Sequence, residues 1–232
     1  MAYKRQKSLL MGVLINKQET NNDAEVYHLP TSKNALIIFV RNPELGKCKT
    51  RLAKTIGDPN ALEIYKILLQ HTADITKDLN VDKYVYYANF IAQNDVWNKD
   101  IYRKKKQKGE HLGSRMEHAF QELFDKGYEK VLVMGSDLYD LDRKAIENAY
   151  TCLDKNDFVI GPALDGGYYL LGMKTLYPSV FKDKKWGANT VFAHTMAALS
   201  GQRVCKLKER NDIDVYEDII GLEIFQKFIE KI

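Results

Sequence analysis

The sequence has few cysteines, no long apolar run and little excess of charge. Its three cysteines, Cys48, Cys152 and Cys205, are far apart and form no CxxC pair, which argues against a disulfide framework and a zinc site. No segment approaches the ~20 apolar residues of a membrane-spanning helix. A formal net charge of +4 does not by itself indicate nucleic-acid binding. This composition favours a reducing cytoplasm.

The first 33 residues are polar and turn-prone and lack clear periodicity. Basic residues precede the short apolar run 9–15, which imitates a signal peptide, but no small-residue cleavage site follows, so we expect no export. We interpret residues 1–33 as an N-terminal extension. No Pro/Gly/Ser-rich linker divides residues 34–232, and 232 residues suit one domain, so we expect a single domain over 34–232.

Segments typical of buried strands alternate with segments of helical periodicity along this domain. The expected strands cover residues 35–40, 84–87, 131–134, 158–160, 168–173 and 203–207, and the expected helices cover 58–79, 116–124, a stretch after Asp142, 188–199 and 216–229. This alternation predicts an α/β fold with a mostly parallel sheet.

The stretch KVLVMGSDLYDL (residues 130–141) contains the first candidate for a functional site. Its apolar run ends in Gly135-Ser136, followed by Asp137 and Asp140. Ligands of open α/β sheets bind beyond the carboxyl ends of the strands, so Asp137 is a candidate metal ligand. The alternative is that both aspartates only shape a turn and cap the next helix.

A basic loop follows the first expected strand. It contains Gly46, Lys49 and Arg51 after Pro43, and such a loop can hold a diphosphate or triphosphate. A solvated basic loop explains it equally well, since the motif GxxxxGK[ST] is absent. We interpret the run at residues 103–106 as a solvated surface cluster.

Two further stretches allow both a functional and a structural interpretation. Asp165-Gly166-Gly167 leads into Tyr168-Tyr169, which suits a backbone close to a ligand or a plain hairpin turn. The acidic stretch 211–218 contains Asp212 and Asp214, and some of its carboxylates are expected to cap the last helix. Because Mg²⁺ takes one or two carboxylates and completes its shell with phosphates, the two acidic loops and the basic loop together predict a nucleotide-diphosphate site.

Five motifs, in order, resemble a known family. FVRNPELGKCKTRLA, GEHLGSRM, GSDLYDL, GPALDGGYYLLG and NDIDVYEDI are similar to the bacterial GT-A-like transferases, a family of uncharacterised glycosyltransferases. That family belongs to the nucleotide-diphospho-sugar transferase superfamily and is related to molybdopterin and phospholactate guanylyltransferases. The resemblance implies a three-layer α/β/α sandwich with a mixed sheet.

The resemblance also implies roles for single residues. Lys49 and Arg51 would lie at the nucleotide phosphates, with Gly46 in the same loop, and Gly166, Gly167 and Tyr168 would border the acceptor or sugar pocket. Arg115 belongs to a motif of the family and is a further candidate binding residue, whose role the motif does not define. Asp137 would hold the metal, Asp214 resembles the second ligand, and Asp212 is its near competitor. The chain departs from the family pattern at Tyr139, where proline is usual, and at Cys48, where valine is usual.

The leading hypothesis is a glycosyltransferase that uses a nucleotide sugar with Mg²⁺ or Mn²⁺ and a small-molecule acceptor. Asp165 is the candidate general base if the reaction inverts the anomeric centre. The alternative is a nucleotidyltransferase that releases pyrophosphate from a nucleoside triphosphate. A third hypothesis is a non-catalytic nucleotide-binding protein on the same fold.

Overall fold

The computed structural model describes residues 13–14 and 27–229, and its centre is a seven-stranded sheet in the order β5-β4-β3-β6-β8-β7-β9. The strands of this sheet are β3 (Asn34–Val40), β4 (Asp82–Tyr87), β5 (Tyr102–Lys106), β6 (Lys130–Met134), β7 (Phe158–Pro162), β8 (Tyr168–Met173) and β9 (Val204–Lys206). Only β8 runs antiparallel to its neighbours. The predicted α/β fold with a mostly parallel mixed sheet is therefore confirmed.

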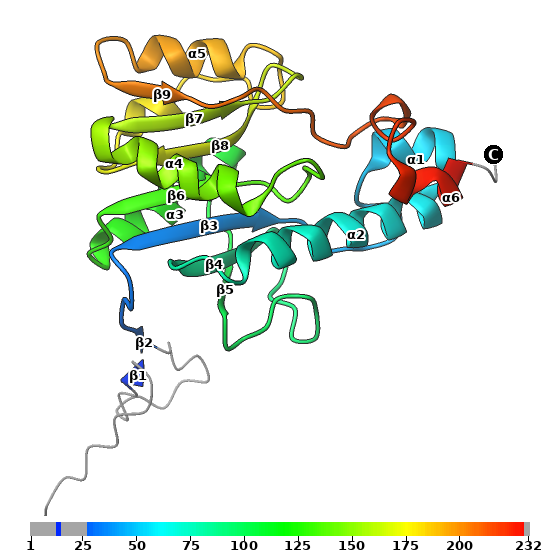
Figure 1. Cartoon of the computed structure of the whole chain (residues 1–232), viewed down its shortest axis with the longest axis horizontal. Coiled ribbons are helices and arrows are strands. Elements are labelled where there is room, and N and C mark those ends of the chain that lie inside the picture. Colours follow the sequence, from blue (N-terminus) through cyan, green and yellow to red (C-terminus); the bar gives the residue numbers. More distant parts are fainter. Residues whose placement is uncertain (1–12, 15–26, 230–232) are drawn as a thin grey trace, which may run out of the picture.

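The sheet is covered on both faces, as Figure 1 shows. Helices α2 (Asp58–Thr76) and α4 (Arg143–Lys155) pack on one face, and α3 (Leu112–Asp125), the 3-10 turn η1 (Pro178–Phe181) and α5 (Val191–Ala198) pack on the other. In β3, the four residues Ala35–Ile38 are fully buried and alternate between the two cores. A strand buried on both faces needs a continuous apolar run, which explains why β3 could be recognised in the sequence.

A third apolar cluster lies beyond the carboxyl end of β3. It joins α1 (Thr50–Ile56), the start of α2 and α6 (Gln226–Ile229), which lie together in Figure 1. The predicted helix over 216–229 is wrong, because this segment forms the 3-10 turns η2 (Tyr216–Asp218) and η3 (Glu223–Phe225) before the short α6. The Asp218 carboxylate accepts from the N–H groups of Asp214 and Val215, so it organises the preceding loop.

Residues 103–106 are not a solvated cluster, because they form the edge strand β5. Arg103 pairs with Asp82 at 2.8 Å, Lys104 with Asp95 at 2.7 Å and Lys105 with Glu122 at 2.5 Å. Charged residues are typical of edge strands because they prevent pairing with another chain.

Cys152 of α4 and Cys205 of β9 form a disulfide, with their Cα atoms 6.0 Å apart. The expectation of no disulfide from the cysteine spacing is therefore wrong. Their separation of 53 residues carries no motif, and only the packing of α4 beside β9 brings the two side chains together. Cys48 is a buried free thiol.

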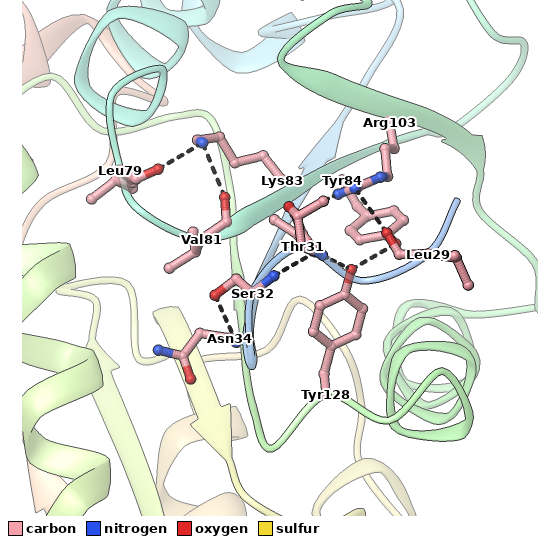
Figure 2. A network of polar contacts seen from close by, with 11 residues as sticks. Leu29, Thr31, Ser32, Asn34, Leu79, Val81, Lys83, Tyr84, Arg103 and Tyr128 are labelled. Carbon is pink, nitrogen blue, oxygen red and sulfur yellow. Dashed lines mark hydrogen bonds and ion pairs between the residues drawn. The ribbon is translucent and has the colours of Figure 1, made fainter. Parts of the chain in front are cut away.

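The segment before β3 is held by Asp82 at the amino end of β4. Its carboxylate accepts from the N–H groups of Thr31 and Ser32 and from the Tyr128 hydroxyl at 2.6 Å, and it pairs with Arg103. Figure 2 shows Thr31, Tyr128 and Arg103 converging on this point. Residues just before the predicted boundary at 34 thus contact the main domain.

Two short strands precede this segment, β1 (Val13–Leu14) and β2 (Tyr27–His28), which pair antiparallel. The remaining expectations for the N-terminal extension fall on residues 1–12 and 15–26, outside the described residues. Within the part of the chain that the structure describes, no helix is both long and apolar enough to cross a membrane.

Candidate functional site

A cavity of about 560 Å³ lies where β3, β4, β6 and β7 end. The chain leaves β3 toward β4 on one side and reaches β6 on the other, so this is the position at which the direction of the strand order reverses. The volume falls within the range of roughly 300–1,000 Å³ that small-molecule sites occupy. This cavity is therefore the candidate functional site, and the site residues predicted from the sequence are compared with it.

The loop after β3 forms one wall of the cavity and is fixed by buried polar contacts. Asn42 is buried, donates from Nδ2 to the carbonyl of Phe90 at 2.8 Å and accepts from Asn89 N–H at 3.1 Å. Lys49 has a positive φ of 49°, as does Gly46 at 71°. These two backbone conformations let the loop turn tightly before α1. This helix begins at Thr50, inside the stretch that the sequence predicted to be a loop.

Asp137 follows β6 and faces the Lys49 side chain. Lys49 Nζ lies 3.1 Å from Asp137 Oδ1, and the Lys49 side chain is only 5% exposed. The Asp137 carbonyl accepts from Ile213 N–H at 2.9 Å, which brings the second acidic loop against the first. The two acidic loops therefore meet as the sequence analysis expected.

Asp212 and Asp165 complete a group of carboxylates on the cavity wall with Asp137. The pKa of Asp212 is raised to about 6, chiefly by burial and then by the negative charges of Asp165 and Asp137, while the charge of Lys49 opposes them. Three carboxylates near one another are therefore balanced by one buried ammonium group.

Asp165 lies in the turn between β7 and β8, so the prediction of a hairpin turn is confirmed, while the contact of this backbone with a ligand stays a prediction. Its Oδ1 accepts from Gly167 N–H at 2.7 Å, which leaves Oδ2 available at the exposed end of the side chain. Gly166 has a φ of 85°, and a Cβ there would lie 2.1 Å from the carbonyl oxygen of Asn189. The turn therefore requires glycine at this position.

Asp214 pairs with Arg51 at 2.6 Å. Neither residue lines the cavity, and Gly46 and Gly166 support loops without lining it. The structure thus brings together Asp137, Asp165, Asp212, Lys49, Arg115, Gly167 and Tyr168, and it separates Arg51 and Asp214 from them. Their predicted roles stay predictions.

The sequence analysis did not predict four residues that line the cavity or support its loops: Asn42, Gln107, Trp186 and Arg210. Gln107 donates to backbone carbonyls at the ends of β3 and β4, Asn42 donates to the Phe90 carbonyl in the loop after β4, and Trp186 packs beside Tyr168. None of them carries a periodic or spacing signal, although Trp186 is one of only two tryptophans in the chain.

Arg210 directly precedes the acidic stretch 211–218 and connects it to the acidic loop after β6. Its Nη1 lies 2.8 Å from Asp140 Oδ2 and also donates to the Asp140 carbonyl, and its side chain is 12% exposed. Its backbone N–H donates to the carbonyl of Pro162 at the end of β7. Arg210 therefore joins the strand ends that carry Asp137, Asp165 and Asp212.

The donor set suits a hard divalent cation. Among residues 13–14 and 27–229, no three His, Cys, Asp or Glu side chains are arranged to enclose a metal ion. Mg²⁺ needs fewer protein ligands than that, because one or two carboxylates, waters and substrate phosphates complete its octahedron. Asp137 and Asp212, which lie in one group with crowded negative charge, fit this requirement.

Comparisons with solved structures confirm the superfamily that the sequence motifs indicated. A "putative nucleotide-diphospho-sugar transferase" from Desulfovibrio desulfuricans G20 is 29% identical, with a TM-score of 0.78, over 87% of this chain and 95% of that chain. A cytidylyltransferase from Leptospira borgpetersenii serovar Hardjo-bovis is 13% identical, with a TM-score of 0.54, over 88% of this chain and 94% of that chain.

A third structure, 4-diphosphocytidyl-2C-methyl-D-erythritol synthase from Anaerococcus prevotii DSM 20548, is 12% identical, with a TM-score of 0.52, over 85% and 96% of the two chains. At these identities the last two likenesses establish the fold alone. No curated protein sequence matches the chain. A family model matches residues 71–188, half of the sequence, and the chain belongs to that family, which is described as uncharacterized protein conserved in bacteria (DUF2064).

Proposed function

We propose that this protein is a metal-dependent glycosyltransferase that uses a nucleotide sugar as donor and a small molecule as acceptor. The family resemblance and the structural neighbours support a transferase-like enzyme of the nucleotide-diphospho-sugar transferase superfamily. The observation that carries the proposal is the meeting of Asp137, Asp165 and Asp212 with Lys49 at one cavity beyond the strand ends.

In this proposal Asp137 and Asp212 hold Mg²⁺ or Mn²⁺, and Asp214 is a less suitable ligand because it does not line the cavity. The metal, when bound, would neutralise charge on the diphosphate of the donor. Lys49 and Lys47 contribute positive charge from the loop after β3, which stabilises the same phosphates. Lys47 lines the cavity, while Lys49 reaches it through its contact with Asp137.

Asp165 is the proposed general base for an inverting reaction. Its Oδ2 would take the proton of an acceptor hydroxyl, the hydroxyl oxygen would form a bond to the anomeric carbon, and the bond from that carbon to the diphosphate would break. Its position on the turn before Tyr168, with one oxygen already bound to Gly167 N–H, holds the carboxylate in one orientation.

Because the chain shares its fold with two cytidylyltransferases, nucleotidyl transfer is the second candidate reaction. In a nucleotidyltransferase, a phosphate of the second substrate attacks the α-phosphorus of a nucleoside triphosphate and pyrophosphate leaves. The same cations and carboxylates would serve that step, so product analysis must separate the two reactions.

The test uses the full chain with Mn²⁺ and a panel of nucleotide sugars and nucleoside triphosphates, followed by binding measurements and by analysis of released nucleoside diphosphate or pyrophosphate. We expect metal-dependent binding of a nucleotide sugar, weakened at least about tenfold, or roughly 1.4 kcal/mol, in Asp137→Asn. Asp154→Asn, an exposed aspartate paired with Lys130, is the matched control. Pyrophosphate release without nucleotide-sugar binding would favour the nucleotidyltransferase, and no binding across the panel would contradict both.

A further inference from the structure

Arg115 lies in the first turn of α3 and lines the cavity. Its Nε donates to the carbonyl of Gly109 at 3.0 Å, and its Nη1 donates to Gln107 Oε1 at 3.4 Å. A Cβ at Gly109 would lie 2.6 Å from the Ser114 hydroxyl oxygen, so glycine is needed for this loop to reach the helix. The glycine and the arginine of the GEHLGSRM segment thus act together.

Gln107 is itself held in one orientation. Its Nε2 donates to the carbonyl of Tyr86 at 2.9 Å and to that of Val40 at 3.3 Å. Because the amide nitrogen is bound to these two strand ends, the amide oxygen faces Arg115. The guanidinium is therefore oriented by a chain of hydrogen bonds that starts at the carboxyl ends of β3 and β4.

The charge of Arg115 has no carboxylate partner among the residues that the structure describes. Its two observed acceptors, a backbone carbonyl and an amide oxygen, are both neutral. Arg51, Arg103, Arg143, Arg203 and Arg210 each pair with an aspartate or glutamate. Arg41 also lines the cavity without an ion pair among the described residues, but Arg115 is the one whose guanidinium is oriented by Gln107. A guanidinium has five N–H donors in a planar fork, so Arg115 keeps donors for a phosphate or carboxylate.

An apolar wall lies next to Arg115. The Tyr168 hydroxyl donates to Met116 Sδ at 3.8 Å, and the rings of Tyr168 and Trp186 meet edge to face at 6.5 Å. A Cβ at Gly113 would lie 2.5 Å from the Trp186 ring, so this glycine lets the indole pack on α3. A charge beside an apolar wall interacts more strongly with an anion than it would in water.

We propose that Arg115, positioned by Gln107, is an anion-binding residue of this cavity and takes a phosphate or carboxylate group of a substrate whose apolar or ring portion lies against Trp186 and Tyr168. The identity of the substrate rests on the transferase function proposed above. The anion then belongs either to the diphosphate of the donor or to an acidic acceptor.

The experiment measures the binding of inorganic phosphate and of nucleoside diphosphates to the full chain by calorimetry, with and without a saturating nucleotide. Arg115→Gln should weaken phosphate binding at least about tenfold, because a charge-assisted bidentate contact is lost. Gln107→Leu should weaken it less, since the charge remains but its orientation is lost. Arg143→Gln, on the exposed face of α4, should bind as the wild type does.

The two sources give different results. Weaker nucleoside-diphosphate binding in Arg115→Gln assigns the anion to the donor, whereas phosphate that still binds to the nucleotide-saturated wild type through Arg115 assigns it to the acceptor. If Arg115→Gln does not fold, Arg115→Lys should still weaken phosphate binding roughly threefold or more, because the planar fork is lost.

Absence of phosphate and nucleotide binding by the wild type, or unchanged binding of both by Arg115→Gln, would overturn the inference. Phosphate binding through Arg115 in a protein that binds no nucleotide would uphold it and contradict the proposed function instead.

Discussion

The Lys49 ammonium group lies 3.1 Å from Asp137 Oδ1 and 6.0 Å from the centre of the Tyr65 ring. It is nearly buried, and it lies beside the same carboxylates that are proposed to bind a divalent cation. Lys49 and the metal therefore share the negative charge of Asp137, and each would weaken the attraction that the other feels there.

Replacing Lys49 should change metal and nucleotide binding in opposite directions. In Lys49→Met, Mn²⁺ should bind roughly threefold or more tightly in the absence of nucleotide, because a repelling positive charge is removed. Nucleoside-diphosphate affinity should fall about tenfold, because a charge-assisted contact to phosphate is lost. Calorimetry with each ligand alone measures both effects, and Lys54→Met on the exposed side of α1 is the control. Weaker Mn²⁺ binding in Lys49→Met would contradict the competition.

The contact between Arg210 and Asp140 should be detectable as coupling between the two acidic loops. Arg210→Met and Asp140→Asn should each weaken Mn²⁺ binding, because Asp212 loses its support, and the double variant should be little worse than either one. A double-mutant cycle on the free energy of unfolding should give a coupling of about 1 kcal/mol. Arg210→Lys should restore part of the Mn²⁺ affinity. Strictly additive effects would show that the two residues act independently.

The strands that carry the site could be recognised from the sequence, because their burial on both faces requires continuous apolar runs. β3 and β6 are such strands, and Asp142 caps α4 as expected by accepting from Ala145 N–H at 2.7 Å. The sequence of β5 contains no such apolar run, so this strand was not predicted. Arg103, Lys104 and Lys105 of this strand are neutralised by Asp82, Asp95 and Glu122, which come from outside the strand.

The choice between Asp212 and Asp214 shows what local sequence cannot decide. Both stand in the same acidic stretch, and either could follow a strand into the site. Ile213 N–H binds the Asp137 carbonyl and the Ile213 side chain is buried, which holds the loop so that Asp212 reaches the cavity. Arg51 pairs with Asp214 outside it. These contacts form only in the folded protein, and no local residue pattern predicts them.

Gly166 should tolerate no side chain. In Gly166→Ala, a Cβ would approach the Asn189 carbonyl oxygen to 2.1 Å at a φ of 85°. Strain and overlap together should lower the free energy of unfolding by about 2–4 kcal/mol. Gly201→Ala has a φ of 80° with open space around it, so it should cost only about 1 kcal/mol. Denaturant unfolding measures both, and equal costs would show that crowding at Asn189 is unimportant.

Asp82 should make the protein sensitive to acid. Burial alone would raise the pKa of Asp82, but hydrogen bonds from Thr31, Tyr128 and Arg103 lower it below its usual range overall. A lowered pKa in the folded state means that the stabilisation is complete above the unfolded-state pKa and is lost as the pH falls toward the folded-state value. We therefore expect stability at neutral pH and a loss below about pH 4.

Arg103→Met tests the same network at neutral pH, because it leaves the buried Asp82 carboxylate without its cation. We expect the free energy of unfolding to fall by about 3 kcal/mol, while Arg143→Met in an exposed pair should change it little. Asp82→Asn should flatten the dependence of stability on pH below about pH 4, since the titrating group is removed. Denaturant unfolding at several pH values measures both effects. An unchanged acid profile in Asp82→Asn would assign the acid sensitivity to another carboxylate.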